Sequence, residues 1–319
     1  MYTDIKTGFT CNNRCIHCVI APIRDNLQDE KKELDSTTEE VKQFIDEAID
    51  RGSDTVVLTG GEVTIRKDFS ELVEYTAGKG LKIVIQTNGR LFARPSQRIL
   101  FKGLPKVLLV MAIHGPDADI HDRITRKKNS FSQTITAIQA LVPLENVNVC
   151  AKIVISKHNA DCISETVQML NQMRISEIVI AFPHAEDFPV AVFKEVVPRY
   201  ESIKGEISRL LKAMDGAEIH MTFETIPYCI MPDNPGFWNR SLDARYTLYG
   251  KENPGFMQRT GDRRVHNWEN ERKAIKQKGS GCGLCVFDKV CEGPWEEYVS
   301  YYGQDEFVPI SDPSVVDKL

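Results

Sequence analysis

Short apolar runs alternate with amphipathic stretches along the first two thirds of the chain. The apolar runs are continuous and bounded by turn residues, which is typical of buried parallel strands. The stretches between them repeat apolar residues at helical spacing. The pattern predicts strands at 4–9, 55–60, 81–87, 106–113, 147–156, 176–182 and 217–223. It predicts helices near 41–49, 68–79, 95–102, 131–142, 161–173 and 197–214.

The helix near residue 41 has the clearest start signal. Residues 36–39 read Ser-Thr-Thr-Glu, which we interpret as a capping box. The apolar stripe of this helix consists of Val41, Phe44, Ile45, Ala48 and Ile49. Its i, i+3, i+4, i+7 spacing predicts an amphipathic helix with one face on the core.

Regular strand–helix alternation predicts a parallel sheet with right-handed crossovers. A closed eight-unit barrel takes about 250 residues, or about 31 per unit. Residues 4–215 hold about six such units on that scale. We therefore expect an α/β fold, a partial (β/α)6 TIM-like barrel, with a doubly wound open sheet as the structural alternative.

The composition changes after residue 223. Residues 231–270 are rich in Pro, Gly, Asn, Asp and Arg, and three cysteines follow at 282–291. The sequence predicts two units: a barrel core at 1–215 and a smaller, irregular C-terminal module at 216–319.

Charge and hydropathy exclude several classes of function. With 40 basic and 45 acidic side chains the net charge is −5, so we do not expect a nucleic-acid partner. No apolar stretch approaches the roughly 18 residues of a membrane span, and the first residues lack a signal-peptide pattern. We expect a cytoplasmic protein. In that compartment thiols stay reduced, so clustered cysteines indicate metal ligands or redox groups.

Three cysteines lie together in CNNRCIHC, residues 11–18. Their C-x3-C-x2-C spacing lets one loop wrap three corners of a four-iron cluster, which usually takes four cysteines. Three protein ligands leave one iron open for another molecule. The loop follows the first strand, at the rim where barrel active sites form. An incomplete zinc site is the alternative.

CNNRCIHC, followed by TGGE at the end of the second strand, resembles the radical S-adenosylmethionine (SAM) superfamily. The resemblance implies that Cys11, Cys15 and Cys18 ligate a [4Fe-4S] cluster whose open iron binds SAM. Reductive cleavage of SAM would yield a 5′-deoxyadenosyl radical that abstracts hydrogen from a substrate. Gly60 and Gly61 would lie beside the SAM methionyl amine, and Glu62 would accept a hydrogen bond from it.

Further strand ends extend the resemblance. QTNGR at 86–90 is similar to a third-strand motif of the family, and it implies that Asn88 lines the cofactor site. His17 stands where the family usually has an aromatic ring. The resemblance identifies neither a catalytic base nor a hydrogen donor, so the catalytic residues are unknown.

A second cysteine group consists of Cys229, Cys282, Cys285 and Cys291. Four ligands suit a second, fully ligated [4Fe-4S] cluster. Closing the long loop to Cys229 costs about 3.5 kcal/mol before a constant term. Structural metal sites contribute roughly 10–16 kcal/mol of coupled folding energy, so this distant ligand is feasible. A structural zinc site is the alternative.

The tail resembles the auxiliary-cluster module called Twitch, a relative of SPASM, through IPYC, HNWENE (266–271) and C-x2-C-x5-C. The whole chain is similar to the radical SAM maturases of the His-Xaa-Ser system and related peptide-modifying enzymes. This implies post-translational modification of a ribosomal peptide. The alternative is a radical SAM dehydrogenase or epimerase acting on a sugar or antibiotic precursor. A non-catalytic iron–sulfur or zinc protein would leave TGGE without a role.

The resemblance also implies partners: a peptide or small-molecule substrate, and a reductase or flavodoxin-type electron donor. Many peptide-modifying relatives carry an N-terminal module that grips a leader peptide. Because the first predicted strand begins near residue 4, we expect a separate leader-binding protein or a substrate that lacks a leader.

Overall fold

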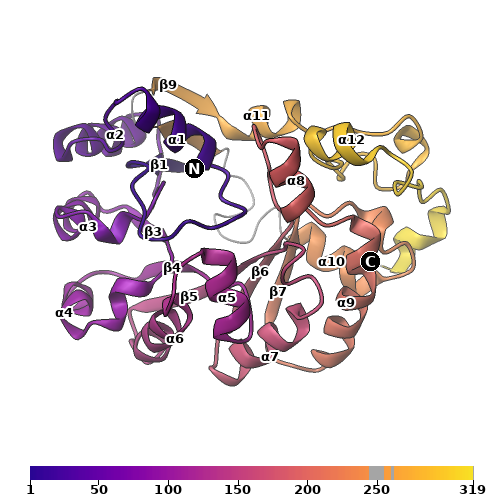
Figure 1. Ribbon diagram of the computed structural model, residues 1–319, viewed down its shortest axis with the longest axis horizontal. Coiled ribbons are helices and arrows are strands. Elements are labelled where there is room, and N and C mark those ends of the chain that lie inside the picture. The colour runs from indigo at the N-terminus through magenta and orange to yellow at the C-terminus, as the bar shows by residue number, and fades with distance from the viewer. Residues whose placement is uncertain (244–254, 260–261, 319) are drawn as a thin grey trace.

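The computed structural model describes residues 1–243, 255–259 and 262–318, and it is built on one curved sheet (Figure 1). Nine strands lie in the order β7-β6-β5-β4-β3-β2-β1-β8-β9. They are β1 (Tyr2–Lys6), β2 (Thr55–Thr59), β3 (Lys82–Thr87), β4 (Val107–Ala112), β5 (Val147–Val154), β6 (Glu177–Ala181), β7 (His220–Glu224), β8 (Gly255–Arg259) and β9 (Asp262–Asn267).

The sheet order distinguishes the two predicted architectures. Each strand from β1 to β7 pairs in parallel with the next one in sequence. A doubly wound sheet would reverse its strand order at a switch point, and β1 to β7 have no such reversal. On the other side of β1, β8 pairs in parallel and β9 follows antiparallel. Within the described residues β7 and β9 are the sheet edges, so the predicted partial barrel is confirmed.

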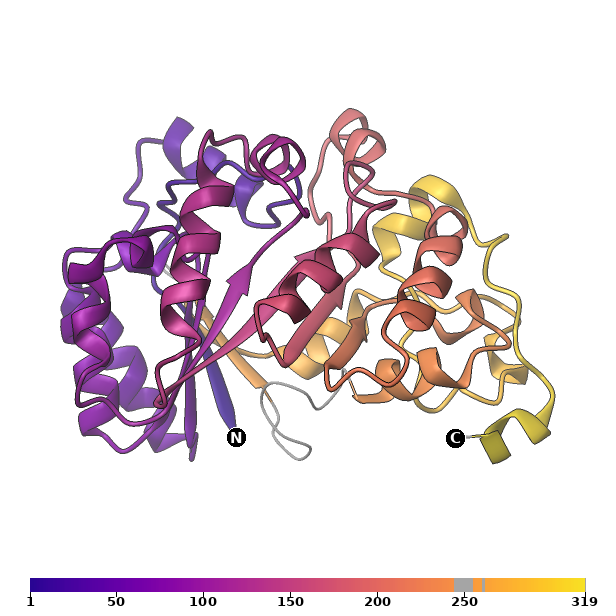
Figure 2. The same ribbon diagram turned by 90° about the horizontal axis from the view of Figure 1, so that it is seen from below.

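Helices cover the outer face of the curved sheet, as Figure 2 shows from below. The helices that connect the strands from β1 to β7 are α1 (Ala21–Asp29), α2 (Thr38–Asp50), α3 (Phe69–Gly78), α4 (Pro95–Arg98), α5 (Ala118–Thr125), α6 (Ser130–Leu141), α7 (Ile163–Gln172), α8 (Val190–Val196) and α9 (Tyr200–Ala213). The later helices are α10 (Pro235–Asp243), α11 (Trp268–Ala274) and α12 (Glu296–Tyr302).

Helix α2 shows how local sequence fixes an element. Thr37 is its N-cap, and its side chain and that of Glu40 bond reciprocally to the backbone. The capping box therefore begins one residue later than the predicted 36–39. The predicted apolar face is correct, because Val41, Phe44 and Ile45 are buried on the core.

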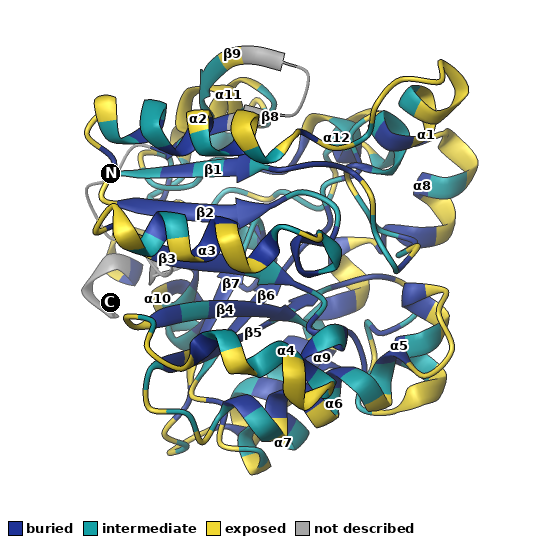
Figure 3. Cartoon of the chain, turned by 90° about the vertical axis from the view of Figure 1, so that its left-hand side faces the viewer, coloured by how far each residue is buried: buried dark blue, intermediate teal, exposed yellow. Residues whose placement is uncertain are grey.

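The strands form the buried centre of the molecule, dark blue in Figure 3, while the helices in front of them expose one face to solvent. Every residue of β2 is buried. Alternate residues face opposite sides, as strand geometry requires. On one side Val57, Val84 and Val110 form a small cluster, whereas Val56 and Leu58 belong to the main core.

The sheet continues past the predicted boundary at residues 215 and 216. Strand β7 adds a seventh parallel strand after the six strand–helix units, and β8 returns to pair with β1. Strands β8 and β9 and helices α10 and α11 were not predicted, because their short segments lack a clean apolar period. The sheet has no break at the boundary between 1–215 and 216–319. The two-unit division therefore stays a prediction.

The C-terminal segment packs beside α9. Tyr298 of α12 lies 4.5 Å from Tyr200 of α9 between ring centroids, and its hydroxyl accepts the Tyr200 backbone N–H at 3.0 Å. Figure 2 shows this yellow segment next to the last helices of the barrel. The cysteines at 282–291 are thereby brought to the β7 side of the sheet.

Among the described helices, none combines the length and the apolar character that crossing a membrane requires.

Candidate functional site

The three-cysteine loop follows β1 and lies at the carboxyl end of the sheet. Cys11, Cys15 and Cys18 are half-buried free thiols. Burial raises the pKa of Cys11 to about 11 and also raises those of Cys15 and Cys18. The neighbouring thiolates of Cys18 and Cys11 would add to the upward pKa shift of Cys15. Deprotonation of all three thiols in this buried loop would therefore need a cationic centre, which a metal cluster would supply.

The end of β2 holds this loop through two glycines. Gly60 has φ +124°, and a Cβ there would lie 2.3 Å from the carbonyl oxygen of Gly8. A Cβ on Gly61 would lie 2.1 Å from the carbonyl oxygen of Thr10. The Gly61 backbone N–H donates to Gly8 O at 2.8 Å. Only glycine allows this approach, which connects β2 to the residues just before Cys11.

Glu62 is buried and its carboxylate is already engaged. Oε1 accepts from the backbone N–H and hydroxyl of Thr64 and from Thr87 Oγ1 at 2.6 Å. Oε2 accepts the Asn88 backbone N–H at 2.6 Å. Burial raises the pKa of Glu62, while the bonds from Thr64, Thr87 and Asn88 oppose that shift. Oε2 accepts a single hydrogen bond from the described residues, so it is the oxygen that can accept a further hydrogen bond.

The turn after β3 reaches back to the cysteine loop. Asn88 Nδ2 donates to Asn12 Oδ1 at 2.6 Å. Arg90 donates from Nη1 to Asn12 O and Asn13 Oδ1, and from Nε to Gln133. Sequence reasoning included Asn88 but missed Arg90, although both stand in the same TNGR stretch after a strand.

Helix α5 supports the other side of the loop. Backbone N–H groups of Arg14 and Ile16 donate to Thr125 O and Ile124 O, each at 2.9 Å. The loop is therefore held from the ends of β2 and β3 and from α5. These hydrogen bonds fix the backbone that carries the cysteines, unlike the backbone of a free surface turn.

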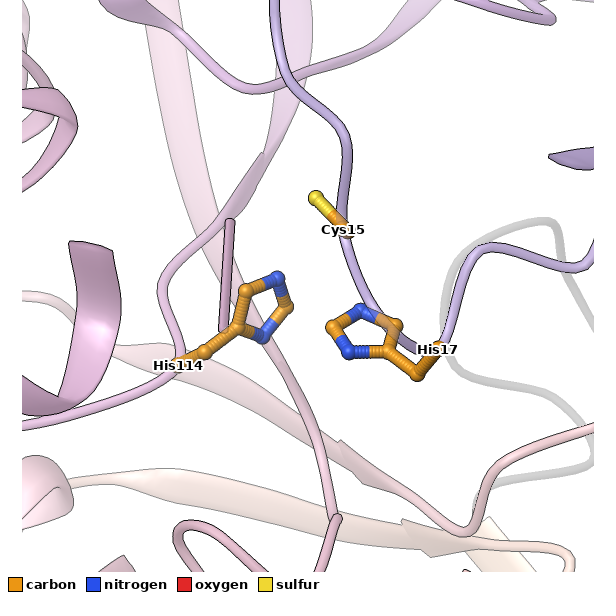
Figure 4. A group of neighbouring side chains, drawn as sticks. All are labelled: Cys15, His17 and His114. Carbon is orange, nitrogen blue, oxygen red and sulfur yellow. The ribbon is translucent and has the colours of Figure 1, made fainter. Parts of the chain in front are cut away.

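Two histidines lie against Cys15 (Figure 4). Ligand atoms of Cys15, His17 and His114 lie within 4.8 Å of one another. The rings of His17 and His114 pack edge to face with centroids 4.4 Å apart. Burial lowers the pKa of His17 to about 4 and that of His114 well below its usual value. Both imidazoles are therefore neutral beside the loop.

The tautomer of His114 follows from its bonds. Its Nδ1 accepts the Val154 backbone N–H at 3.4 Å. An accepting Nδ1 leaves the ring proton on Nε2. In Figure 4 this edge of the ring points toward Cys15. No rule of residue spacing could have paired His114 with His17, because the two residues come from different strand ends.

The four other candidate ligands share one pocket. Cys229, Cys282, Cys285 and Cys291 line it together. Burial raises the pKa of Cys229 to about 12, and the charges of the other three thiols add to that shift. Cys229 belongs to the short helix Tyr228–Ile230, and Cys282 begins the short helix Cys282–Leu284.

Aromatic contacts hold these two segments together. Tyr228 stacks on Phe287 with centroids 4.6 Å apart and an interplanar angle of 8°. Trp238 lies 5.2 Å from Phe287 and donates from Nε1 to Tyr228 O. The distant Cys229 is thus positioned by packing, and four thiols around one pocket fit a second four-iron cluster.

The two remaining cysteines lie elsewhere. Cys150 is fully buried in β5, and Cys162 stands at the N-terminus of α7. All nine cysteines lie in described parts of the chain, and none forms a disulfide.

Comparison with known proteins places this geometry in a family. The model of the radical SAM superfamily matches residues 5–170. An AdoMet-dependent heme synthase of Methanosarcina barkeri is 28% identical over 167 residues, which is 51% of this chain and 45% of that protein. The antilisterial bacteriocin subtilosin biosynthesis protein AlbA of Bacillus subtilis is 28% identical over 142 residues, 44% of this chain and 30% of AlbA.

The chain therefore spans less than half the length of these curated relatives. Among solved structures, Streptococcus suis SuiB bound to the precursor peptide SuiA has a TM-score of 0.64 at 15% identity. The likeness covers 92% of this chain and 71% of SuiB, and it shows a common fold.

The match of the family model covers more than half of the chain, including the cysteine loop and TGGE. Members of this family are enzymes that use a [4Fe-4S] cluster and SAM. The donor set fits these cofactors, because three thiols occupy one loop that is held at the carboxyl ends of parallel strands. The expected family is confirmed: the chain belongs to the radical SAM superfamily.

Proposed function

We propose that this enzyme modifies a peptide by radical chemistry. The observation that carries the proposal is the presence of two separate cysteine sites: a three-thiol loop at the strand ends and a four-thiol pocket beside β7. When bound, the cluster and SAM supply the 5′-deoxyadenosyl radical. A second cluster can take up the electron that an oxidised or cross-linked substrate must lose.

Each residue has a proposed role at the first site. Cys11, Cys15 and Cys18 would hold three irons. The backbone at Gly60 and Gly61 and the free acceptor capacity of Glu62 would receive the SAM amine. Asn88 and Arg90 would keep the loop in place through Asn12.

At the second site, Cys229, Cys282, Cys285 and Cys291 would ligate the auxiliary cluster. Their position around one pocket supports this assignment over a surface group of unrelated cysteines. A structural zinc ion would use the same four ligands. Metal analysis separates the two, because only iron and sulfide give visible charge-transfer absorption.

A peptide substrate is supported by the relatives. AlbA is a bacteriocin biosynthesis protein, and SuiB has been solved with a precursor peptide. The heme synthase favours a small-molecule substrate as the second candidate. An electron donor of reductase or flavodoxin type and a separate leader-binding protein complete the proposal.

The test is anaerobic reconstitution with iron and sulfide, followed by reduction in the presence of SAM. We expect 5′-deoxyadenosine and about eight irons per chain. Co-expression with short peptides encoded beside the gene should then yield a peptide of altered mass. Deoxyadenosine formation without any modified peptide, but with turnover of a small molecule, would favour the second candidate.

A further inference from the structure

A second cavity lies between the end of β7, helix α10 and helix α11. It has a volume of about 50 Å³. Its polar lining consists chiefly of Glu224, Ser241, Arg272, Lys276 and Glu292. Cys291 and Tyr228 border both this cavity and the four-cysteine pocket. A molecule bound here would therefore lie directly beside the auxiliary cysteines.

Three hydrogen-bond donors of this cavity have no partner within the described part of the chain. They are Ser241 Oγ, Arg272 Nε and Lys276 Nζ, and all three atoms are shielded from solvent. Arginine and lysine nitrogens can only donate. A buried donor without an acceptor costs about 1–3 kcal/mol, so native structures rarely leave three together. An acceptor held in the cavity, whether an ordered water or a ligand, would satisfy these three donors.

Two carboxylates line the cavity, and each accepts a hydrogen bond from a basic side chain. Glu292 accepts from Arg272 Nη2 at 2.6 Å. Glu224 accepts from Lys152 Nζ at 2.8 Å. Glu297 has one unpaired buried oxygen, Oε2, but this residue does not line the cavity. Its other oxygen lies 3.4 Å from His184 Nε2.

Lys276 is fixed in place rather than free to turn outward. Its Nζ lies 3.4 Å from the centroid of the Trp295 ring, and the backbones of the two residues form an antiparallel bridge. Trp295 in turn stacks on His184, from the loop after β6, with centroids 4.0 Å apart. Burial lowers the pKa of Lys276 to about 7, and an anionic partner would offset that cost.

We propose that this cavity binds a carboxylate of the substrate, with Lys276, Arg272 and Ser241 as its donors. A carboxylate is acceptor-only and offers two oxygens to a guanidinium, an ammonium and a hydroxyl. The inference deepens the proposed function and rests on it: the peptide would present an acidic side chain or its C-terminal carboxylate here. Either group would hold the substrate between the strand ends and the auxiliary cluster.

The test uses the full chain, reconstituted anaerobically with SAM, and calorimetric titration with three small probes. N-acetylglutamate α-amide carries a side-chain carboxylate, and N-acetylalanine carries a terminal one. N-acetylglutamine amide is the neutral counterpart of the first. We expect saturable binding of at least one carboxylate and an affinity at least about tenfold lower for the neutral probe. The stronger of the two carboxylates identifies the group that the cavity accepts.

Variants connect the binding to this cavity. Lys276→Met and Arg272→Met should each weaken carboxylate binding by about tenfold or more, and Ser241→Ala by several-fold. Lys273→Met is the matched control on α11, since Lys273 is exposed and pairs with Glu269. It should bind the carboxylate as the unmodified protein does. Ser241→Ala removes a single hydroxyl, so it remains informative if a buried-charge variant folds poorly.

The proposal is wrong if no carboxylate binds saturably, if the neutral probe binds equally well, or if Lys276→Met and Arg272→Met behave like Lys273→Met. Deoxyadenosine formation is measured in the same preparation. Its presence without carboxylate binding overturns this inference alone. Its absence overturns the proposed function, and the titrations still decide whether the cavity is an anion site.

Discussion

Arg90 donates from Nη1 to the backbone carbonyl of Asn12 at 2.7 Å, across 78 positions of sequence. The same nitrogen donates to Asn13 Oδ1 at 2.8 Å. The turn after β3 thereby holds the residues between Cys11 and Cys15. The cysteine loop is positioned by a buried cation rather than by its own backbone alone.

Replacing Arg90 should therefore loosen the first cluster site. Hydrogen bonds from a charged group contribute about 1.5–3 kcal/mol each, and Arg90→Met removes three. We expect a lower unfolding midpoint in urea and faster loss of iron from the first site. Iron release to a chelator under anaerobic conditions measures the second effect.

Arg94→Met is the matched control, because Arg94 is exposed four positions further along the same segment. It should leave both the unfolding midpoint and the iron release unchanged. Equal effects of the two substitutions would show that Arg90 does not position the loop.

Glu62 offers a second test of the frame around the loop. Its two oxygens accept four hydrogen bonds, from Thr64, Thr87 and Asn88. Glu62→Gln replaces one acceptor oxygen with an NH2 group. This NH2 donor would then face a donor group of Thr64, Thr87 or Asn88. We expect a loss of about 1–3 kcal/mol in the free energy of unfolding and a higher dissociation constant for SAM.

The exposed pair Lys42–Glu71 supplies the control for this change. Glu71→Gln should alter the free energy of unfolding by less than about 1 kcal/mol and leave SAM binding as it is. If Glu62→Gln were as mild as Glu71→Gln in urea denaturation, the buried carboxylate would not connect β2 to β3 as described.

The sequence predicted the barrel because its signals are local. Apolar runs such as 55–60 identify a strand wherever it lies, and the repeated helices fix the parallel order. Strand β8 escaped prediction because its pairing with β1 is set by residues far away in the chain. Gly255–Arg259 has no alternation strong enough to mark it as a strand.

The candidate site divides in the same way. The cysteine spacing and TGGE could be recognised from the sequence because each motif consists of residues that are close together in the chain. The contact of His17 with His114 and the bonds of Arg90 depend on how strand ends meet, which no spacing encodes. The position of Lys276 could not be predicted either, because no local sequence pattern distinguishes a buried lysine from an exposed one.

The second cysteine group makes a stoichiometric prediction. Cys229→Ala should lower the iron content from about eight to about four per chain, because it leaves three thiols at a site where, unlike the first, no cofactor is proposed to bind the open iron. Cys162→Ala is the control, since Cys162 stands at the N-terminus of α7 and does not line the four-cysteine pocket. It should retain all the iron. Unchanged iron in Cys229→Ala would remove this residue from the ligand set.

The buried histidines predict a dependence of stability on pH. Burial lowers the pKa of His121 to about 4, below its ordinary value of 6.5. Between these values the unfolded chain binds a proton that the folded chain does not, so stability falls as pH decreases from about 6.5 to 4 and is full above 6.5. In His121→Gln this contribution disappears. The slope of the free energy of unfolding against pH should then decrease by an amount that corresponds to at most about one proton taken up on unfolding. Urea unfolding at successive pH values measures it, and an unchanged slope would contradict the assignment.

Phe287 connects stability to metal binding in the C-terminal segment. It is 2% exposed, stacks on Tyr228 beside Cys229, and lies between Cys285 and Cys291 in sequence. Phe287→Ala should lower the free energy of unfolding by about 3–5 kcal/mol, because it removes a buried ring and leaves a cavity. It should also reduce the iron of the second site alone, since Cys229 would lose the ring that aligns its segment. Phe287→Leu keeps most of the volume and should retain more iron than the alanine variant. If Phe287→Ala kept full iron despite the lost stability, the metal rather than the aromatic stack would be what brings Cys229 to the other three thiols.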